Sequence, residues 1–200
     1  MIKPNVTTVK ELLESCDLYE RVLDAISANV NVAGATTSAW EAANESLDEW
    51  VVEFVPRSNR IAGQCRPPGS KRLVGVIRLH RELFVAGREA DRNQTFLHEV
   101  AHQINFYLNR YSYARSPHGA FWKRIMVSMG AAPRTCHSYT FLMEKARADR
   151  EAKGHKHEYT CKDCGFTYKK MRALKHAEFR HHGACRHKLN GGRLHHVVVR

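Results

Sequence analysis

The sequence predicts an α+β fold in which helices pack on a small sheet, followed by a small C-terminal module. Three observations support this prediction. Three amphipathic runs have helical spacing, and short β-like segments stand between the second run and the third. The last quarter of the chain differs in composition from the rest. The 200 residues suffice for one domain with a real core and one small appendage, and are too few for two full-sized domains.

Positive charge is concentrated in that last quarter. From Lys153 onward, twelve Lys and Arg residues face three acidic ones, a net charge of +9, whereas residues 1–152 carry +3. Eight of the thirteen histidines lie there as well. We therefore expect a body at residues 1–150 and a basic tail at residues 155–200. A localised basic patch is typical of proteins that bind polyanions, most often nucleic acid, although a basic surface can also serve solubility alone.

The first residues, "MIKPNVTTVKELLESCDLYE", lack the apolar core of a signal peptide, and no eighteen apolar residues follow one another. We expect an intracellular protein, cytoplasmic or located at the nucleoid or in the nucleus, that is not secreted and does not bind membranes. In a reducing compartment the cysteines are not expected to form disulfides. We predict that three of them fill small spaces, Cys16, Cys65 and Cys136, and that three bind metal, Cys161, Cys164 and Cys185.

The body begins with two amphipathic runs. Each opens on the spacing of a capping box, Thr8 with Glu11 and Ser38 with Glu41. The apolar stripes that follow are predicted to face the core: Leu12, Cys16, Tyr19, Leu23 and Ile26 in the first run, and Trp40, Ala43, Leu47 and Trp50 in the second. We expect residues 1–38 to form a helix that covers the body.

Short β-like segments come next. The stretches "VVEFV" (51–55), "RIAGQCR" (60–66) and "LVGVIRLH" (73–80) are typical of strands, and "PPGSK" is typical of a turn. Ile77 and Leu79 would share one face of their strand. These segments predict a small antiparallel or mixed sheet.

The third amphipathic run contains "FLHEVAHQINF" (96–106). Its apolar stripe consists of Leu97, Val100, Ala101, Ile104 and Leu108. His98 and His102 lie on an adjoining face, where positions four apart are neighbours, so both imidazoles can bind one zinc ion at about 2.0–2.1 Å. Glu99 projects between them and could polarise a bound water.

A catalytic zinc usually has three protein ligands and a water. Because the pattern H-E-x-x-H has a probability of roughly 0.06 in a random chain of this composition, a third ligand has to be found. The candidates are His80, His118 and His137. His118 in "SPHGAFWKRIM" is the best, because the link 109–117 can bring the chain back over the helix and Gly119 permits a tight turn. We expect His80, at the end of a strand, at the surface or behind a ligand.

The basic tail contains "YTCKDCGFTYKKMRALKHAEFRHHGACRHKL". Cys161-x2-Cys164 is followed, after seventeen residues, by His182-x2-Cys185. This spacing is typical of a zinc ribbon in which histidine replaces one cysteine. Such a small module cannot bury a sufficient core, so we expect a structural zinc with four protein ligands to stabilise it. His181 or His187 could take the place of His182.

The stretches "HEVAH", "SPHGAFWKRIM" and "GAAPRTCHSYTF", in this order and at these separations, resemble the SprT-like metalloproteases. "RIAGQCR" followed by "VIRLHREL" resembles the strands that lead into the metal helix of that family. The resemblance covers about residues 40–190 and implies a zincin-like fold, with His98, His102 and His118 as zinc ligands and Glu99 as general base. The family's Arg-Thr-His stretch is here "RTCH", so His137 is either near the site or a helix-start or surface residue.

The resemblance implies a zinc-dependent endopeptidase in which Glu99 takes a proton from water and returns it to the leaving amine. Tyr111 and Tyr113 are candidate hydrogen-bond donors to the oxyanion. In relatives that process DNA–protein crosslinks, nucleic acid recruits and activates the protease, so we expect DNA-bound or DNA-crosslinked proteins as substrates. The candidate nucleic-acid contacts are Lys169, Lys170, Arg172, Lys175 and Arg180, interleaved with the aromatic residues Tyr159, Phe166, Tyr168 and Phe179.

We therefore expect a monomer with two zinc ions, one catalytic and one structural, that binds DNA, either single- or double-stranded, without reading its sequence. Two alternatives differ from this prediction. The body could have lost catalysis and serve a nucleic-acid-binding or regulatory protein. The site could also hydrolyse another amide, in peptidoglycan or in ubiquitin conjugates, although nothing in the tail favours that.

Overall fold

The computed structural model describes residues 7–55, 61–136, 139–152, 157–170, 173–174, 182–185 and 193–198. The chain forms two compact units, Met1–Met143 and Glu144–Arg200, and the division falls within the last helix. The helices are α1 (Val9–Ser15), α2 (Tyr19–Ala33), α3 (Thr37–Glu49), α4 (Glu89–Leu108), α5 (Arg110–Arg115), α6 (Ala120–Ser128) and α7 (Thr140–Ala152). In the described residues, no helix is long and apolar enough to cross a membrane.

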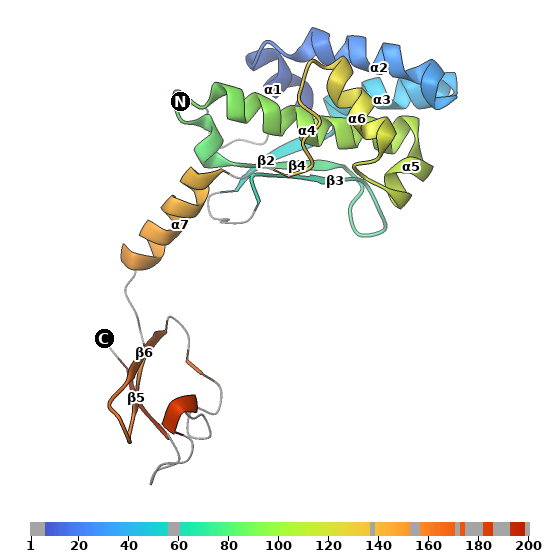
Figure 1. The fold of residues 1–200 in the computed structure, drawn as a ribbon. Coiled ribbons are helices and arrows are strands. Elements are labelled where there is room, and N and C mark those ends of the chain that lie inside the picture. Colours follow the sequence, from blue (N-terminus) through green and yellow to red (C-terminus); the bar gives the residue numbers. More distant parts are fainter. Residues whose placement is uncertain are drawn as a thin grey trace. The chain divides into compact units, whose positions relative to one another are not determined.

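The sheet of the first unit has the strand order β1 (Thr7–Thr8), β2 (Val51–Val55), β4 (Val76–His80) and β3 (Gly63–Arg66). Helices α1 to α6 lie on one side of it, and η1 (Arg81–Phe84), a single 3₁₀ turn, connects β4 to α4 (Figure 1). Strands β2 and β4 are parallel, whereas β1 and β3 are antiparallel to their neighbours. The predicted α+β class and the mixed sheet are therefore confirmed.

The register of β3 decides which of its side chains meet the helices. Cys65 pairs with Ile77, and Gly63 pairs with Leu79. Ile77 and Leu79 are buried as predicted, and residues that pair directly across a sheet share one face. Gly63 and Cys65 therefore face α4, which packs against β3.

Helix α4 is buried along its middle turns. All residues from Thr95 to Asn105 are buried, because α3 and α6 pack on this helix from one side and β3 and β4 from the other. The predicted apolar stripe lies in the core together with the indoles of Trp50 and Trp122. His98 and His102 are thus buried as well, although they lie off the stripe.

The N-terminal region differs from the single covering helix that its apolar spacing predicts. The capping box at Thr8 and Glu11 is present, with N–H···O distances of 3.1 and 2.9 Å. However, α1 ends after two turns, because Asp17 has φ 56° and the Leu18 N–H donates to the Leu13 carbonyl at 2.9 Å. A left-handed residue with this hydrogen bond closes a helix. Two helices therefore pack on the core where the stripe suggests one.

The beginning of α3 also differs from the prediction. The N-cap is Thr36, whose Oγ1 accepts from the Ala39 N–H at 3.2 Å, so the expected capping box at Ser38 and Glu41 is wrong. The helix consequently presents Ala43, Ser46 and Leu47 to the core, while Trp40 is exposed.

The second unit contains a three-stranded antiparallel sheet with the order β6 (Thr167–Lys170), β5 (His157–Cys161) and β7 (Leu194–Val198), and a short 3₁₀ helix η3 (Gly183–Cys185). Its buried cluster consists of Tyr159, Cys161, Cys185 and Leu194. The Tyr159 hydroxyl accepts a hydrogen bond from the Leu174 N–H at 2.8 Å. The core that the described residues form is too small to offset by itself the entropy of ordering the chain.

Candidate active site

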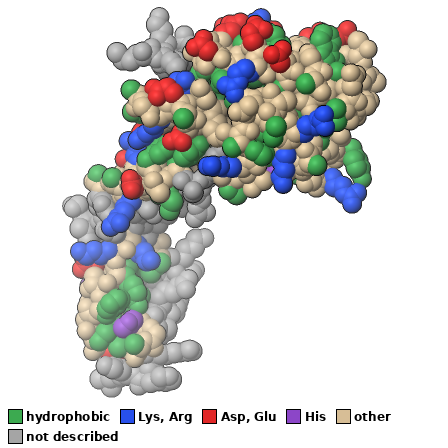
Figure 2. Space-filling model, turned by 45° about the horizontal axis from the view of Figure 1, so that its top comes forward, with side chains coloured by type: hydrophobic (Ala, Val, Ile, Leu, Met, Phe, Trp, Pro, Cys, Tyr) green, Lys and Arg blue, Asp and Glu red, His purple; other side chains and the backbone are tan. Residues whose placement is uncertain are grey.

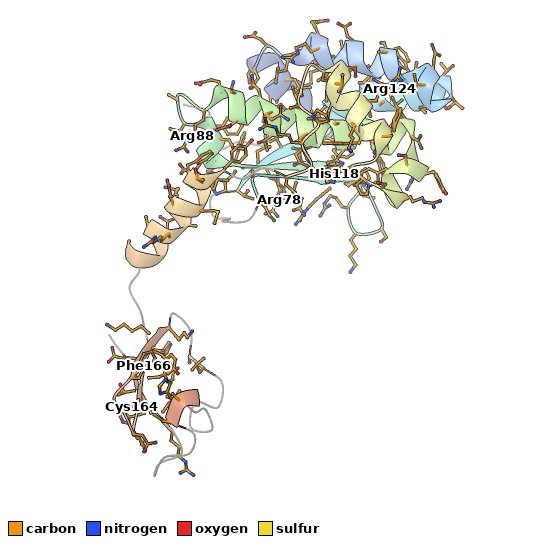
Figure 3. The ribbon with its side chains drawn as sticks, viewed as in Figure 1. Arg78, Arg88, His118, Arg124, Cys164 and Phe166 are labelled. Atoms are coloured by element: carbon orange, nitrogen blue, oxygen red, sulfur yellow. The ribbon has the colours of Figure 1, made fainter. Side chains whose placement is uncertain are left out.

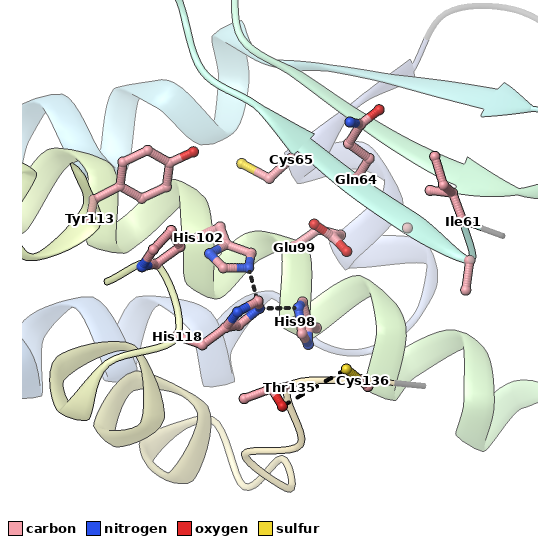
Figure 4. Close-up of a pocket in the computed structure, with 13 residues that line it drawn as sticks. Ile61, Gln64, Cys65, His98, Glu99, His102, Tyr113, His118, Thr135 and Cys136 are labelled. Carbon is pink, nitrogen blue, oxygen red and sulfur yellow. Dashed lines mark hydrogen bonds between the residues drawn. The ribbon is translucent and has the colours of Figure 1, made fainter. Parts of the chain in front are cut away.

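Three imidazoles converge beside α4. His98 and His102 lie on consecutive turns of this helix, and His118 follows α5 (Figure 4). The His118 Nε2 lies 3.0 Å from the His102 Nε2 and 3.1 Å from the His98 Nε2. Tetrahedral ligands at Zn–N distances of about 2.0–2.1 Å are roughly 3.3–3.4 Å apart. The three nitrogens therefore fit a single zinc ion after small shifts.

The protonation of these histidines also suits a metal. Burial, and secondarily the neighbouring His118, lowers the pKa of His102 to about 3. Burial lowers the pKa of His118 in the same direction. A neutral imidazole carries only one N–H, so three Nε2 atoms that face one another cannot all be satisfied by mutual hydrogen bonds. A cation that accepts their lone pairs removes this conflict.

The segment that carries His118 differs from the expected loop. Residues 110–115 form α5, and the Asn109 side chain caps it by accepting from the Ser112 N–H at 3.0 Å. Gly119 has φ −67°, an ordinary value, so the chain does not need a glycine conformation to enter α6. It is therefore the short helix α5 that returns the chain to α4.

Trp122 supports all three imidazoles. Its ring centroid lies 4.7 Å from that of His98, 5.5 Å from that of His102 and 4.7 Å from that of His118. Its fully buried indole Nε1 donates to the His98 carbonyl at 3.4 Å. Trp122 is a buried residue of α6, and sequence reasoning gave it no role at the site. Its position one helical turn after His118 is the signal that could have indicated one.

Glu99 and the three histidines line one cavity of about 470 Å³. Its other walls are residues 61–65, Tyr113, Pro117, Thr135 and Cys136. Of the two candidate tyrosines, Tyr113 is thus at the site, whereas Tyr111 is 72% exposed and is not part of the lining. Cys136 is exposed at the cavity and does not fill a small space, so that expectation is wrong.

The Glu99 carboxyl lies between α4 and β3 (Figure 4). Burial raises its pKa to about 8, and the backbone N–H of Cys65 opposes this rise. A divalent cation beside it would favour the ionised form. Burial also raises the pKa of Tyr113 to about 12, so its hydroxyl is a hydrogen-bond donor at neutral pH.

Gly63 allows β3 to approach Glu99 closely. A Cβ atom at this position would lie 2.6 Å from the Glu99 Oε1 and 2.8 Å from the Thr95 Cγ2. We expect Gly63→Ala to displace the carboxylate, to lower peptide cleavage roughly 10- to 100-fold and to cost about 1–3 kcal/mol of unfolding free energy. Assays of cleavage, zinc content and thermal unfolding test this.

Gly69→Ala is the matched control for this prediction, because a Cβ at Gly69 meets nothing within 4 Å. Equal cleavage by the two variants would show that the close approach of β3 to Glu99 does not matter.

Of the other two candidate ligands, the structure places only His80, which is not in this group. His80 is buried, caps η1 by accepting from the Glu82 N–H at 3.2 Å and does not line the cavity, so the expectation of a surface position is wrong. His137 lies outside the described residues.

A second candidate metal centre lies in the second unit. The ligand atoms of Cys161, Cys164, His182 and Cys185 all lie within 4.8 Å of one another. The His182 Nδ1 is 3.4 Å from the Cys164 Sγ, and the Phe166 ring stacks on the imidazole with centroids 4.8 Å apart (Figure 3). Three sulfurs and one imidazole nitrogen suit a tetrahedral structural zinc. The alternatives His181 and His187 lie outside the described residues.

Two of the candidate nucleic-acid contacts, Lys169 and Lys170, are exposed on β6. Lys169 lies 3.9 Å from Glu158. Phe166 is 51% exposed, whereas Tyr159 is fully buried and cannot stack on a base, which corrects that expectation. Tyr168 is partly buried against the cluster around Tyr159. The other candidates, Arg172, Lys175, Phe179 and Arg180, lie outside the described residues.

A family model supports the resemblance that the motifs indicate. The model of the SprT-like family matches residues 34–176. The match includes the four cavity residues His98, Glu99, His102 and His118 and ends before His182 and Cys185. No curated protein matches the chain significantly. Because the family model covers most of the sequence, the chain belongs to the SprT-like family.

Proposed function

We propose that this chain is a zinc-dependent endopeptidase that associates with DNA and cleaves DNA-bound or DNA-crosslinked proteins. Membership of the SprT-like family indicates a metalloprotease-type domain. The observation that carries the proposal is the convergence of the Nε2 atoms of His98, His102 and His118 at a cavity that Glu99 also lines. A catalytically silent body would have no need of this complete set.

In the proposed hydrolysis, each of these cavity residues has a separate role. His98, His102 and His118 would hold zinc, which supplies a Lewis acid and lowers the pKa of water to about 7. Glu99 takes the proton from the attacking water and returns it to the leaving nitrogen. Tyr113 donates a hydrogen bond to the oxygen that becomes negative. The buried indole of Trp122 keeps the three imidazoles in place.

The wall formed by β3 favours a polypeptide substrate. In the described sheet β3 is an edge strand, and residues 61–65 line the cavity. An extended peptide can pair with such an edge through main-chain hydrogen bonds, which do not depend on its sequence. This arrangement supports an endopeptidase of broad specificity over a hydrolase of another amide.

The association with DNA rests on the second unit. Exposed Lys169 and Lys170 can contact phosphates, and the half-exposed ring of Phe166 can stack on an unpaired base. Such contacts do not read the base sequence. The affinity would therefore be similar for different sequences and would fall steeply with salt concentration.

We expect DNA to accelerate cleavage of a basic DNA-binding protein by the full chain. Binding of enzyme and substrate to one strand raises their effective concentration to about millimolar, so an increase on the order of tenfold is expected at low salt. Gel assays with and without single-stranded or duplex DNA measure it, and a protein of similar size that does not bind DNA is the control substrate. Cleavage that DNA leaves unchanged would contradict the association with DNA; no cleavage of either protein would contradict the peptidase.

A further inference from the structure

In the first unit, acidic and basic residues are concentrated in different parts of the sequence. Residues 7–55 contain two Lys and Arg residues and ten acidic ones, a net charge of −8. Residues 61–136 contain twelve and four, a net charge of +8. The near-neutral total hides this separation. In Figure 2 acidic side chains gather along the upper edge of this unit, and Lys and Arg side chains are most frequent below it.

Part of the positive half borders the cavity. The loop between β3 and β4 carries Lys71 and Arg72, and α5 carries Arg110 and Arg115; we call these four residues the basic rim. The strand before the loop and α5 both contribute to the cavity lining. In the single view that Figures 1 and 3 share, the loop and α5 are drawn toward the same end of the unit. The four residues of the basic rim are not part of the lining, but they lie on segments that adjoin it.

Among the described residues, no acidic side chain neutralises the basic rim. Within the described part of the chain, no carboxylate forms an ion pair with any of its four side chains. Arg115 donates to the Tyr111 hydroxyl at 2.8 Å, and the Arg110 guanidinium lies 4.8 Å from the centre of the Phe106 ring. Both interactions position a guanidinium group, and because both partners are uncharged, neither neutralises its positive charge.

Exposed rings and aliphatic groups accompany these charges. Tyr111, next to Arg110, has 72% of its surface exposed, and Leu73, next to Arg72, has 94%. An exposed ring with a guanidinium at its hydroxyl and further cations on the same segment suits an unpaired base with its phosphates. An acidic peptide would satisfy the cations but offers few rings to stack on tyrosine. The combination therefore favours a single-stranded nucleic acid.

We propose that the basic rim and Tyr111 form a binding surface for single-stranded nucleic acid on the protease unit itself, beside the cavity. This surface would bind DNA in addition to the second unit. Its role in presenting a substrate rests on the proposed function, whereas the binding itself does not. A strand held there presents a protein attached to it next to Glu99. It also cancels the positive charge that opposes the approach of a basic substrate.

The experiment measures binding of a fluorescent 20-nucleotide oligothymidine to the full chain by anisotropy over a range of salt concentrations. We expect Lys71→Gln/Arg72→Gln, and separately Arg110→Gln/Arg115→Gln, each to reduce the slope of log affinity against log salt by about 1.4, since one contact to a single strand contributes about 0.7. Lys123→Gln/Arg124→Gln removes the same charge from α6, away from the cavity lining, and should leave the slope unchanged.

Tyr111 has its own test. Tyr111→Ala should weaken oligothymidine binding roughly tenfold, with a much smaller effect on duplex DNA, and Tyr111→Phe should restore the affinity. Zinc content and thermal unfolding of every variant show that it is folded.

Rim variants that bind oligothymidine like the α6 control would overturn the proposal. So would variants that keep DNA binding but lose binding to polyglutamate, or to vesicles of phosphatidylserine and phosphatidylcholine, since the surface would then serve an acidic peptide or a membrane. Cleavage of a neutral peptide by the wild type is measured in the same preparations. Its absence would contradict the peptidase and leave the binding result intact.

Discussion

The Glu99→Gln variant is expected to bind as much zinc as the wild type and to lose cleavage by about 10²–10⁴-fold, the usual contribution of a general base. Glutamine has nearly the same shape as glutamate, so the cavity between α4 and β3 is preserved. Its amide cannot accept a proton at neutral pH, so the attacking water is no longer activated. Single-turnover cleavage of a peptide, together with metal analysis, measures both effects.

Two further variants make this result specific. Glu89→Gln removes an exposed carboxyl from the first turn of the same helix and should keep full activity. His102→Ala should remove one zinc ion and abolish cleavage, because the cavity then retains only two imidazoles. Undiminished proteolysis by Glu99→Gln would exclude Glu99 as the base, whatever the metal content.

The Cys185→Ser variant is expected to lose one of two zinc ions per chain and to unfold the second unit. Zinc contributes about 10–16 kcal/mol in small zinc modules of this kind, and the hydrophobic cluster that the described residues form around Tyr159 is too small to replace that. The first unit has its own core and should stay folded. Metal analysis gives the zinc content, and limited proteolysis shows which unit has become accessible.

Cys136→Ser is the control, since Cys136 belongs to neither candidate metal group and the variant should keep both zinc ions. A wild-type chain that holds a single zinc ion would eliminate one of the two centres. Two ions in Cys185→Ser would show that Cys185 is not a ligand.

Local patterns in the sequence predicted the features that depend on neighbours along the chain. The 3.6-residue period predicted α4, and the capping box predicted where α1 begins. The end of α1 could not be predicted in this way, because Leu12, Cys16, Tyr19, Leu23 and Ile26 fit one uninterrupted helix. Only the left-handed backbone of Asp17 separates them into two.

The parts of the site that were missed depend on contacts between distant segments. Trp122 reads as one more core residue of α6 until the return of the chain through α5 places His118 beside it. In the sequence, Gly63 is only a glycine within a strand. The register of β3 with β4 brings its backbone close to Glu99. The charge separation was hidden because the sum over residues 1–152 adds the acidic helices to the basic remainder.

The enclosure of α4 has a consequence for how firmly each part of the cavity is held. The backbone amides between Thr95 and Asn105 are shielded by helices on one side and strands on the other, so they exchange with solvent only when the whole unit unfolds. The opposite walls are β3, an edge strand of the described sheet, and α5, which has no buried residue, and we expect both to open locally. The histidines of α4 would then sit on a rigid segment, while the surfaces that an incoming polypeptide must pass adapt to its side chains.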